Sequence, residues 1–189
     1  MDDCTDAFVE ACAAGDAYAA ASFLSSWPGM VDVHWNEDAA FRAACGGGSE
    51  QMVTWLHAVI SPDLQTCGPR AFTMACEAAN TGAVQALWGL GVGTSLQNIS
   101  DGLRWCLRTA ACYDDAHQRV QCLQLLWEAH GAFDIHENGD WVYKEAHDSG
   151  HAEVLEWVKA KGGPLAHWPV RVGECALRWE QSTHVAAST

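Results

Sequence analysis

One local pattern recurs along the chain with a period of about 33 residues, and this repetition limits the folds available to it. A large apolar residue is followed, three and four positions later, by two small residues, as in Phe8, Ala11 and Cys12. Cys12, Cys45 and Cys76 follow one another at nearly equal intervals. A period of this length indicates a stack of similar units. The large residues that begin the pattern are Phe8, Phe41, Phe72, Leu103 and Tyr143.

Each unit predicts two short helices joined by a tight turn. The spacings of three and four place the large and small residues on one helical face, where another helix can approach closely. The turns that follow end the first helix and can cap the second. They lie at Gly15–Asp16, Gly48–Ser49, Ala79–Asn80 and Gly150–His151. The residues predicted to cap the first helices are Thr5, Asp38, Ser100 and Asp140.

The repetition predicts a single all-α domain over residues 1–181, built of about five units. The fourth unit departs from the pattern and carries an insertion near 108–119. Because each unit of such a stack contacts only its neighbours, the last one needs a cap, here a helix at 164–181, and a flexible tail follows at 182–189. The unit boundaries are expected near 5–36, 37–67, 68–98, 99–136 and 137–163.

The pattern resembles the ankyrin repeat, which has a period of about 33 residues, a turn and two helices. The resemblance rests on Ala-Cys-x-x-Gly-Asp at 11–16, Ala-Cys-x-x-Gly-Ser at 44–49 and Gly-His-Ala-Glu-Val at 150–154. No unit contains the family's Thr-Pro-Leu-His signature, so the units are degenerate, and they look most like the ankyrin repeats of large DNA viruses. A tetratricopeptide or HEAT solenoid is the competing family, although the loops here are long for it. The resemblance implies an ankyrin-like helix-turn-helix solenoid that binds other proteins without catalysis.

The resemblance also implies a concave binding surface made of the loops and the starts of the first helices. An exposed tryptophan on such a surface is a frequent hot spot for binding. Trp35 either plays this part or folds back onto the next loop, and the sequence favours neither. The expected partner-binding residues are Asp32, His34, Trp35, Asn36, Asp63, Gln65, Thr94, Gln97, His136, Asn138, Asp140 and Trp141.

Half of the ten tryptophans follow the repeat. Four of them fall in predicted second helices, and a fifth, Trp27, lies at the end of the first unit's second helix. We therefore expect all five to pack in the core between adjacent units. The four are Trp55, Trp88, Trp127 and Trp157.

The chain carries a formal net charge of −14, and its acidic side chains are concentrated at positions 1–66, where Arg42 is the one lysine or arginine. This balance excludes a protein that tracks nucleic-acid phosphates, which needs a basic stripe. It favours a protein partner with a basic patch. With no secretory leader and no apolar stretch long enough to span a membrane, we expect a cytoplasmic protein (the host cytoplasm for a viral one), reduced cysteines and a monomer.

Two other function classes stay open. A zinc-binding structural module would use Cys106, Cys112, His117 and Cys122, although these lack the closely spaced ligand pairs that structural zinc sites favour. A small enzyme is the other class, but no nucleophile stands on a recognisable elbow or helix start. Self-association is a further possibility. The expectation from sequence is a protein without enzymatic activity, cofactor or resident metal.

Overall fold

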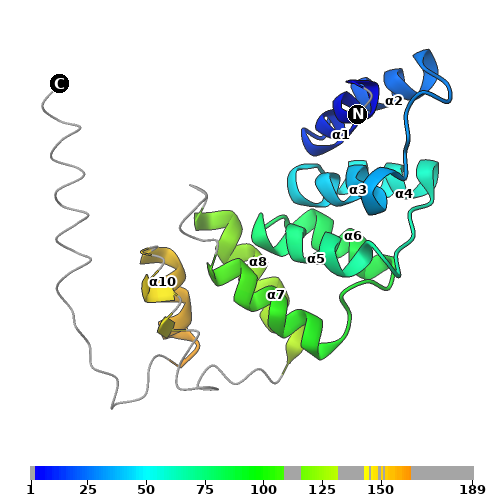
Figure 1. The fold of residues 1–189 in the computed structure, drawn as a ribbon. Coiled ribbons are helices and arrows are strands. Elements are labelled where there is room, and N and C mark those ends of the chain that lie inside the picture. Colours follow the sequence, from blue (N-terminus) through cyan, green and yellow to red (C-terminus); the bar gives the residue numbers. More distant parts are fainter. Residues whose placement is uncertain are drawn as a thin grey trace, which may run out of the picture.

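The computed structural model describes residues 3–108, 116–131, 143–144, 146–148, 150 and 152–162 (Figure 1). These residues form helices and turns and include no strand, which confirms the predicted all-helical class for this part of the chain. The predicted cap at 164–181 and tail at 182–189 lie outside the described residues. The helices are α1 (Asp3–Ala13), α2 (Ala17–Ser26), α3 (Trp35–Gly47), α4 (Glu50–Ile60), α5 (Gly68–Glu77), α6 (Thr81–Gly89), α7 (Leu96–Arg108), α8 (Ala116–His130) and α10 (Ala152–Ala160).

The two helices of each pair from α1–α2 to α7–α8 pack against each other, and successive pairs are stacked. The first helices of the units contact in the order α1, α3, α5 and α7, while α4, α6 and α8 form a second row. The α8 helix also packs against α10, so the stack runs in chain order from the α1–α2 pair to α10 (Figure 1). None of the described helices combines the length and apolar composition needed to cross a membrane.

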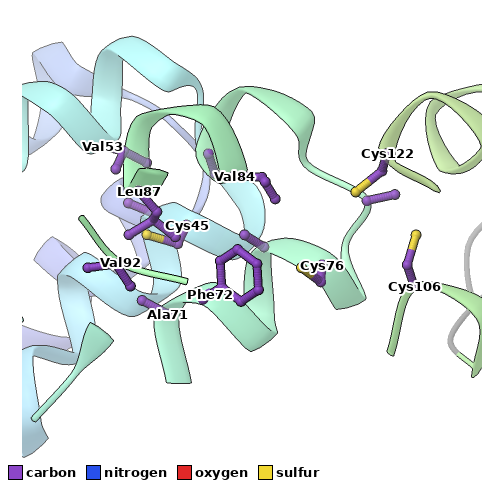
Figure 2. Close-up of a cluster of buried hydrophobic side chains, with 14 of the residues drawn as sticks. Cys45, Val53, Ala71, Phe72, Cys76, Val84, Leu87, Val92, Cys106 and Cys122 are labelled. Carbon is purple, nitrogen blue, oxygen red and sulfur yellow. The ribbon is translucent and has the colours of Figure 1, made fainter. Parts of the chain in front are cut away.

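The repeating apolar residues form the core, as predicted. Phe8 and Phe41 are fully buried, and the other three large residues of the pattern are at most 6% exposed. The small residues beside them are buried too, and Figure 2 shows this cluster around Phe72. A Cβ atom on Gly102 of α7 would lie 2.9 Å from the sulfur of Cys76 on α5. Small side chains at these positions therefore set how closely the first helices approach.

Three of the predicted caps of the second helices are confirmed, and the fourth, His151, lies outside the described residues. Asp16, Ser49 and Asn80 each precede a second helix, and each side-chain oxygen accepts a hydrogen bond from a backbone N–H in the first turn. The donor–acceptor distances are 2.8, 3.2 and 3.1 Å, and the donors are the amides of Ala19, Met52 and Ala83.

The turns of neighbouring helix pairs are in direct contact. The side-chain amide of Asn80 donates hydrogen bonds to the carbonyl oxygens of Cys45, at 3.2 Å, and Gly48, at 2.7 Å. At the contact between the turns of the first and second helix pairs, a Cβ atom on Gly47 would lie only 2.2 Å from the carbonyl oxygen of Ala13. A glycine at position 47 is therefore required by the approach of another backbone.

The predicted caps of the first helices are wrong where the structure describes them. Thr5 and Ser100 lie inside α1 and α7, because these helices begin earlier in the chain than the repeat pattern suggested. Asp38 directly precedes the right-handed part of α3, but its carboxylate oxygens bond His34 and Asp63 instead of the amides of the first turn. Asp140 lies outside the described residues. The buried side chains of Thr5 and Asp38 instead accept hydrogen bonds from the loop that follows their own helix pair, as described below.

The tryptophan prediction is correct for four residues and wrong for Trp27. The four tryptophans of the second helices are partly buried and pack against the core. Trp27 is 47% exposed because it is the C-cap of α2, with non-helical backbone angles (φ −127°, ψ 59°), so the helical periodicity that placed it inside no longer applies. The four are Trp55, Trp88, Trp127 and Trp157.

Replacing Gly47 with alanine tests the contact between turns. The added Cβ would overlap the Ala13 carbonyl oxygen, so Gly47→Ala should lower the free energy of unfolding by about 1–3 kcal/mol, measured by urea denaturation followed by tryptophan fluorescence. Gly89→Ala is the matched control, because no atom lies within 4 Å of its Cβ position and alanine favours a helix. Equal stability of the two variants would contradict the close approach.

Candidate functional site

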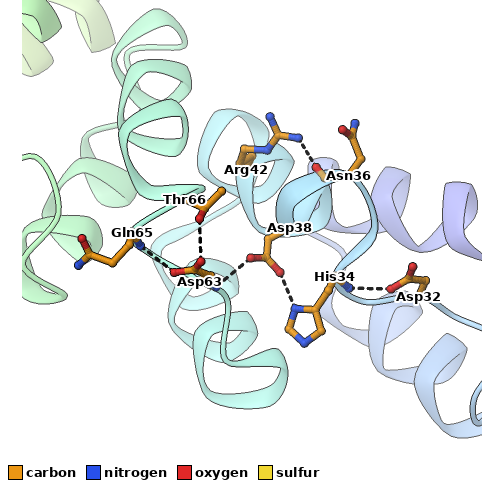
Figure 3. A network of polar contacts seen from close by, with 8 residues as sticks. All are labelled: Asp32, His34, Asn36, Asp38, Arg42, Asp63, Gln65 and Thr66. Atoms are coloured by element: carbon orange, nitrogen blue, oxygen red, sulfur yellow. Dashed lines mark hydrogen bonds and ion pairs between the residues drawn. The ribbon is translucent and has the colours of Figure 1, made fainter.

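The first two loops between helix pairs contain the same kind of aspartate turn. In the first loop the Asp32 carboxylate accepts a hydrogen bond from the backbone N–H of His34, at 3.1 Å. In the second loop the Asp63 carboxylate accepts one from the backbone N–H of Gln65, also at 3.1 Å. Both are turns in which an aspartate bonds the amide two positions on, and they occupy equivalent places in successive units (Figure 3). Two of the predicted binding segments therefore have equivalent local structure.

A buried side chain of a first helix holds each of these loops. The hydroxyl oxygen of Thr5 accepts a hydrogen bond from the backbone N–H of Asp32, at 3.1 Å. The carboxylate of Asp38 accepts one from the backbone N–H of Asp63, at 2.9 Å. We call these two hydrogen bonds the loop rungs. They fix the position of each loop relative to the helix pair before it.

The third loop is held differently. Position 69, which corresponds to Thr5 and Asp38, is a proline and offers no side-chain acceptor. The indole N–H of Trp88 instead donates a hydrogen bond to the carbonyl oxygen of Gly93, at 3.2 Å. A Cβ on Gly93 would lie 2.3 Å from the ring of Phe72, so this loop lies directly on the core.

Both carboxylate oxygens of Asp38 have partners. One is the amide of Asp63, and the other is the ring nitrogen Nδ1 of His34, at 2.6 Å (Figure 3). Asp38 is 4% exposed, and burial of a carboxylate is costly unless its oxygens are hydrogen-bonded. Because His34 belongs to the first loop and Asp63 to the second, this one side chain joins the two loops.

The start of α3 is a left-handed turn. Asn36, Glu37 and Asp38 have φ angles of 51°, 56° and 57°, a conformation that costs roughly 1–2 kcal/mol for each residue other than glycine. Hydrogen bonds around the turn offset this cost. The guanidinium of Arg42 donates to the Asn36 carbonyl oxygen, and Asp38 makes the two bonds described above. The turn presents Asn36 and Glu37 to solvent.

The structure brings five of the predicted binding residues into one polar network. Asp32, His34 and Asn36 come from the first loop and the turn after it, and Asp63 and Gln65 come from the second loop (Figure 3). All five are exposed, as are Thr94 and Gln97 farther along the chain, while Trp35 is partly buried. The remaining predicted residues lie outside the described part of the chain: His136, Asn138, Asp140 and Trp141.

Hydrogen bonds favour the ionised form of Asp63. The hydroxyl of Thr66 and the backbone N–H of Gln65 both donate to its carboxylate, and together they hold its pKa below the ordinary value of 3.8. Asp32 and Glu37 are also exposed, so the first two loops present acidic side chains to solvent. The base of this region, Arg42, is only partly exposed.

A hollow of about 430 Å³ lies between α6 and α8, away from the predicted residues. Sequence reasoning missed it, although the glutamines of α8 at 118, 121 and 124 recur at every third position and so lie near one another on the helix. Carboxamide, hydroxyl and carboxylate groups line it together with two apolar side chains. The lining residues are Thr81, Gln85, Val120, Gln121, Gln124, Leu125 and Glu128.

Of the residues of the zinc alternative, Cys106 and Cys122 lie together in the core, apart from the exposed His117. Cys106 and Cys122 are buried, His117 is exposed and lies 2.9 Å from the Gln121 side-chain nitrogen, and Cys112 is outside the described residues. No group of three or more histidine, cysteine, aspartate or glutamate side chains in the described part of the chain is arranged to hold a metal ion.

Burial also suppresses the reactivity of the core thiols. It raises the pKa of Cys12 to about 12 and that of Cys67 to about 11, from an ordinary value of 9.0. Such thiols are protonated at neutral pH and are therefore poor nucleophiles and poor metal ligands.

Comparison of the chain with protein-family models, with curated proteins and with solved structures finds no match.

The need for both carboxylate oxygens of Asp38 can be tested with a carboxamide substitution. Asp38→Asn keeps the size of the side chain and its tolerance of positive φ, but it can accept only one of the two hydrogen bonds. We expect a loss of about 1–2 kcal/mol in the free energy of unfolding, measured by urea denaturation. Glu37→Gln makes the same chemical change at the neighbouring exposed position and should stay within about 0.5 kcal/mol of the unsubstituted protein. A similar effect of both substitutions would contradict a need for two acceptor oxygens at position 38.

The pKa of Asp63 provides a second test. Thr66→Val removes the hydroxyl that contributes most to lowering it, so this pKa should rise toward 3.8, as followed by NMR titration of the carboxyl carbon. A carboxylate with a depressed folded-state pKa stabilises the fold above its unfolded-state pKa, and this stabilisation is lost as pH falls through the folded-state value. The variant should therefore lose less stability than the unsubstituted protein below about pH 4. Thr54→Val, on exposed α4 surface, should leave the Asp63 titration unchanged.

Proposed function

We propose that this chain is a non-enzymatic protein-interaction module of the ankyrin-like repeat class. Its partner docks on the loop surface, which we define as residues 32–37 and 63–65. The observation that supports this most directly is the pair of loop rungs, which hold the backbone of both loops against buried side chains. A surface that is ordered before binding loses less conformational entropy when a partner docks.

The charge of the loop surface indicates the kind of partner. Asp32, Glu37 and Asp63 are exposed, and the network around Asp63 favours its ionised form. The whole chain has a net charge of −14. Such a surface attracts a protein with a basic patch and speeds the encounter, most strongly at low ionic strength.

The side chains of the described region give more support to binding than to catalysis. Catalytic sites generally place a few converging polar groups with shifted pKa values in a pocket. The hollow between α6 and α8 is lined mainly by carboxamide and apolar groups, with Glu128 as its acid. The thiols whose pKa is shifted are buried in the core between helices, where they serve as small packing groups.

The proposal is tested by neutralising the acids of the loop surface without breaking its turns. The triple variant Asp32→Asn, Glu37→Gln and Asp63→Asn retains the side-chain carbonyl oxygens that accept the loop hydrogen bonds. Affinity for a basic partner, identified by cross-linking in the native cell and then purified, should fall on the order of tenfold at low salt, with a weaker dependence on salt. Isothermal titration calorimetry measures both effects.

A second triple variant tests the α6–α8 hollow as an alternative docking site. Gln85→Ala, Gln121→Ala and Glu128→Gln alter the α6–α8 hollow and should leave affinity for the same partner unchanged. If this variant weakens binding and the loop variant does not, the partner docks in the hollow and the proposal is wrong. Trp35→Ala separates the two open interpretations of this tryptophan, since a hot-spot residue costs at least about 2 kcal/mol of binding free energy.

A further inference from the structure

Far from the loop surface, α8 and α10 place two tryptophan rings at right angles. The ring centroids of Trp127 and Trp157 are 5.7 Å apart, and the ring planes make an angle of 89°. The indole N–H of Trp157 donates a hydrogen bond to the side-chain oxygen of Gln124 on α8, at 3.0 Å. This bond fixes the orientation of one ring, and both rings also pack against the hydrophobic core. The two rings therefore form the walls of a preorganised corner.

A cation already lies in this corner. The ammonium nitrogen of Lys161 is 5.5 Å from the centroid of the Trp127 ring and 5.7 Å from that of the Trp157 ring. Both distances fall within the range of about 6 Å in which the negative face of an aromatic ring attracts a cation. The structure thus shows that the corner has the size and the electrostatics to hold an alkylammonium group.

The Lys161 side chain can leave the corner because of the position of this residue in the chain. It follows the last residue of α10, where its backbone N–H bonds the carbonyl oxygens of Trp157 and Val158. Its side chain is therefore attached at a helix end. The neighbouring Lys159, by contrast, is paired with the Glu156 carboxylate at 2.7 Å.

We propose that Trp127 and Trp157 form a binding site for a quaternary ammonium group, the side chain of a trimethylated lysine on a partner protein, and that Lys161 occupies the site in its absence. A primary ammonium ion is strongly hydrated and gives up much hydration energy when it enters an aromatic corner. A trimethylated ammonium is more weakly hydrated, keeps the positive charge and adds methyl groups that contact the rings. It can therefore displace the lysine.

Occupation of the site by Lys161 must lower the affinity of the site for an external ligand. A site that is free for only a fraction of the time binds its ligand with an affinity reduced by that fraction. Removing the lysine side chain should therefore tighten binding of an external quaternary ammonium. The rings themselves would be unchanged, because Gln124 and the core hold them.

The experiment titrates Nα-acetyl-Nε-trimethyllysine amide into the full chain and into Lys161→Ala, and follows the indole N–H resonances of Trp127 and Trp157 by NMR. We expect binding to be about tenfold tighter in Lys161→Ala than in the unsubstituted protein. Two further probes separate charge from shape: the unmethylated lysine derivative and the uncharged analogue in which carbon replaces the ammonium nitrogen. Both should bind more weakly than the trimethylated probe.

Two variants serve as controls. Lys159→Ala removes the nearby lysine that pairs with Glu156 and should bind the probe as the unsubstituted protein does. Trp127→Leu in the Lys161→Ala background removes one wall and should abolish binding. Circular dichroism and the Trp157 indole resonance show whether α10 stays folded against α8 in each variant.

The proposal is overturned if folded Lys161→Ala fails to bind the trimethylated probe, or binds its uncharged analogue equally well. Lys161 would then be a structural clamp between α8 and α10. Should the substitution release α10, the titration of the unsubstituted protein decides instead. There the trimethylated probe must shift both indole resonances and the Lys161 side-chain resonances, and the absence of these shifts overturns the proposal.

Discussion

The arrangement of this molecule depends on how closely its first helices can approach one another. Alanine, cysteine and glycine face one another along α1, α3, α5 and α7, so backbones and small side chains come into direct contact. The large residue of each pattern fills the space beside this contact, and the second helices cover it. Larger side chains at the small positions would force the helices apart, because the interior is already packed closely. The packing of each of the first two helix pairs in turn allows a buried side chain of its first helix to reach the loop that follows the pair.

The features that could be predicted from the sequence are those determined by near neighbours in the chain. The buried face of each first helix follows from the spacing of Phe8, Ala11 and Cys12, which a helix brings to one side. The caps at Asp16, Ser49 and Asn80 follow from a bond to an amide three positions on. In both cases the contact is contained in one helix or one turn, so local rules suffice.

The features that could not be predicted depend on contacts between distant residues. The bond between Asp38 and the Asp63 amide joins residues far apart in the chain, and nothing local distinguishes this aspartate from an ordinary helix cap. Most residues of the loop surface were anticipated, but the side chains that hold it in place were not. The hollow between α6 and α8 and the corner around Lys161 depend on how neighbouring helices are placed, which a repeat pattern alone leaves undetermined.

The buried thiols have a consequence for the dynamics of the stack. Cys12, Cys45, Cys76 and Cys106 lie between successive first helices or beside them, and all are inaccessible to solvent in the folded chain. A thiol-modifying reagent can reach each of them only when the surrounding helices separate. The modification rate of each cysteine would then report the frequency of opening at its own level of the stack. The chain thus contains, at intervals of one unit, natural probes of whether its helix pairs open singly or together.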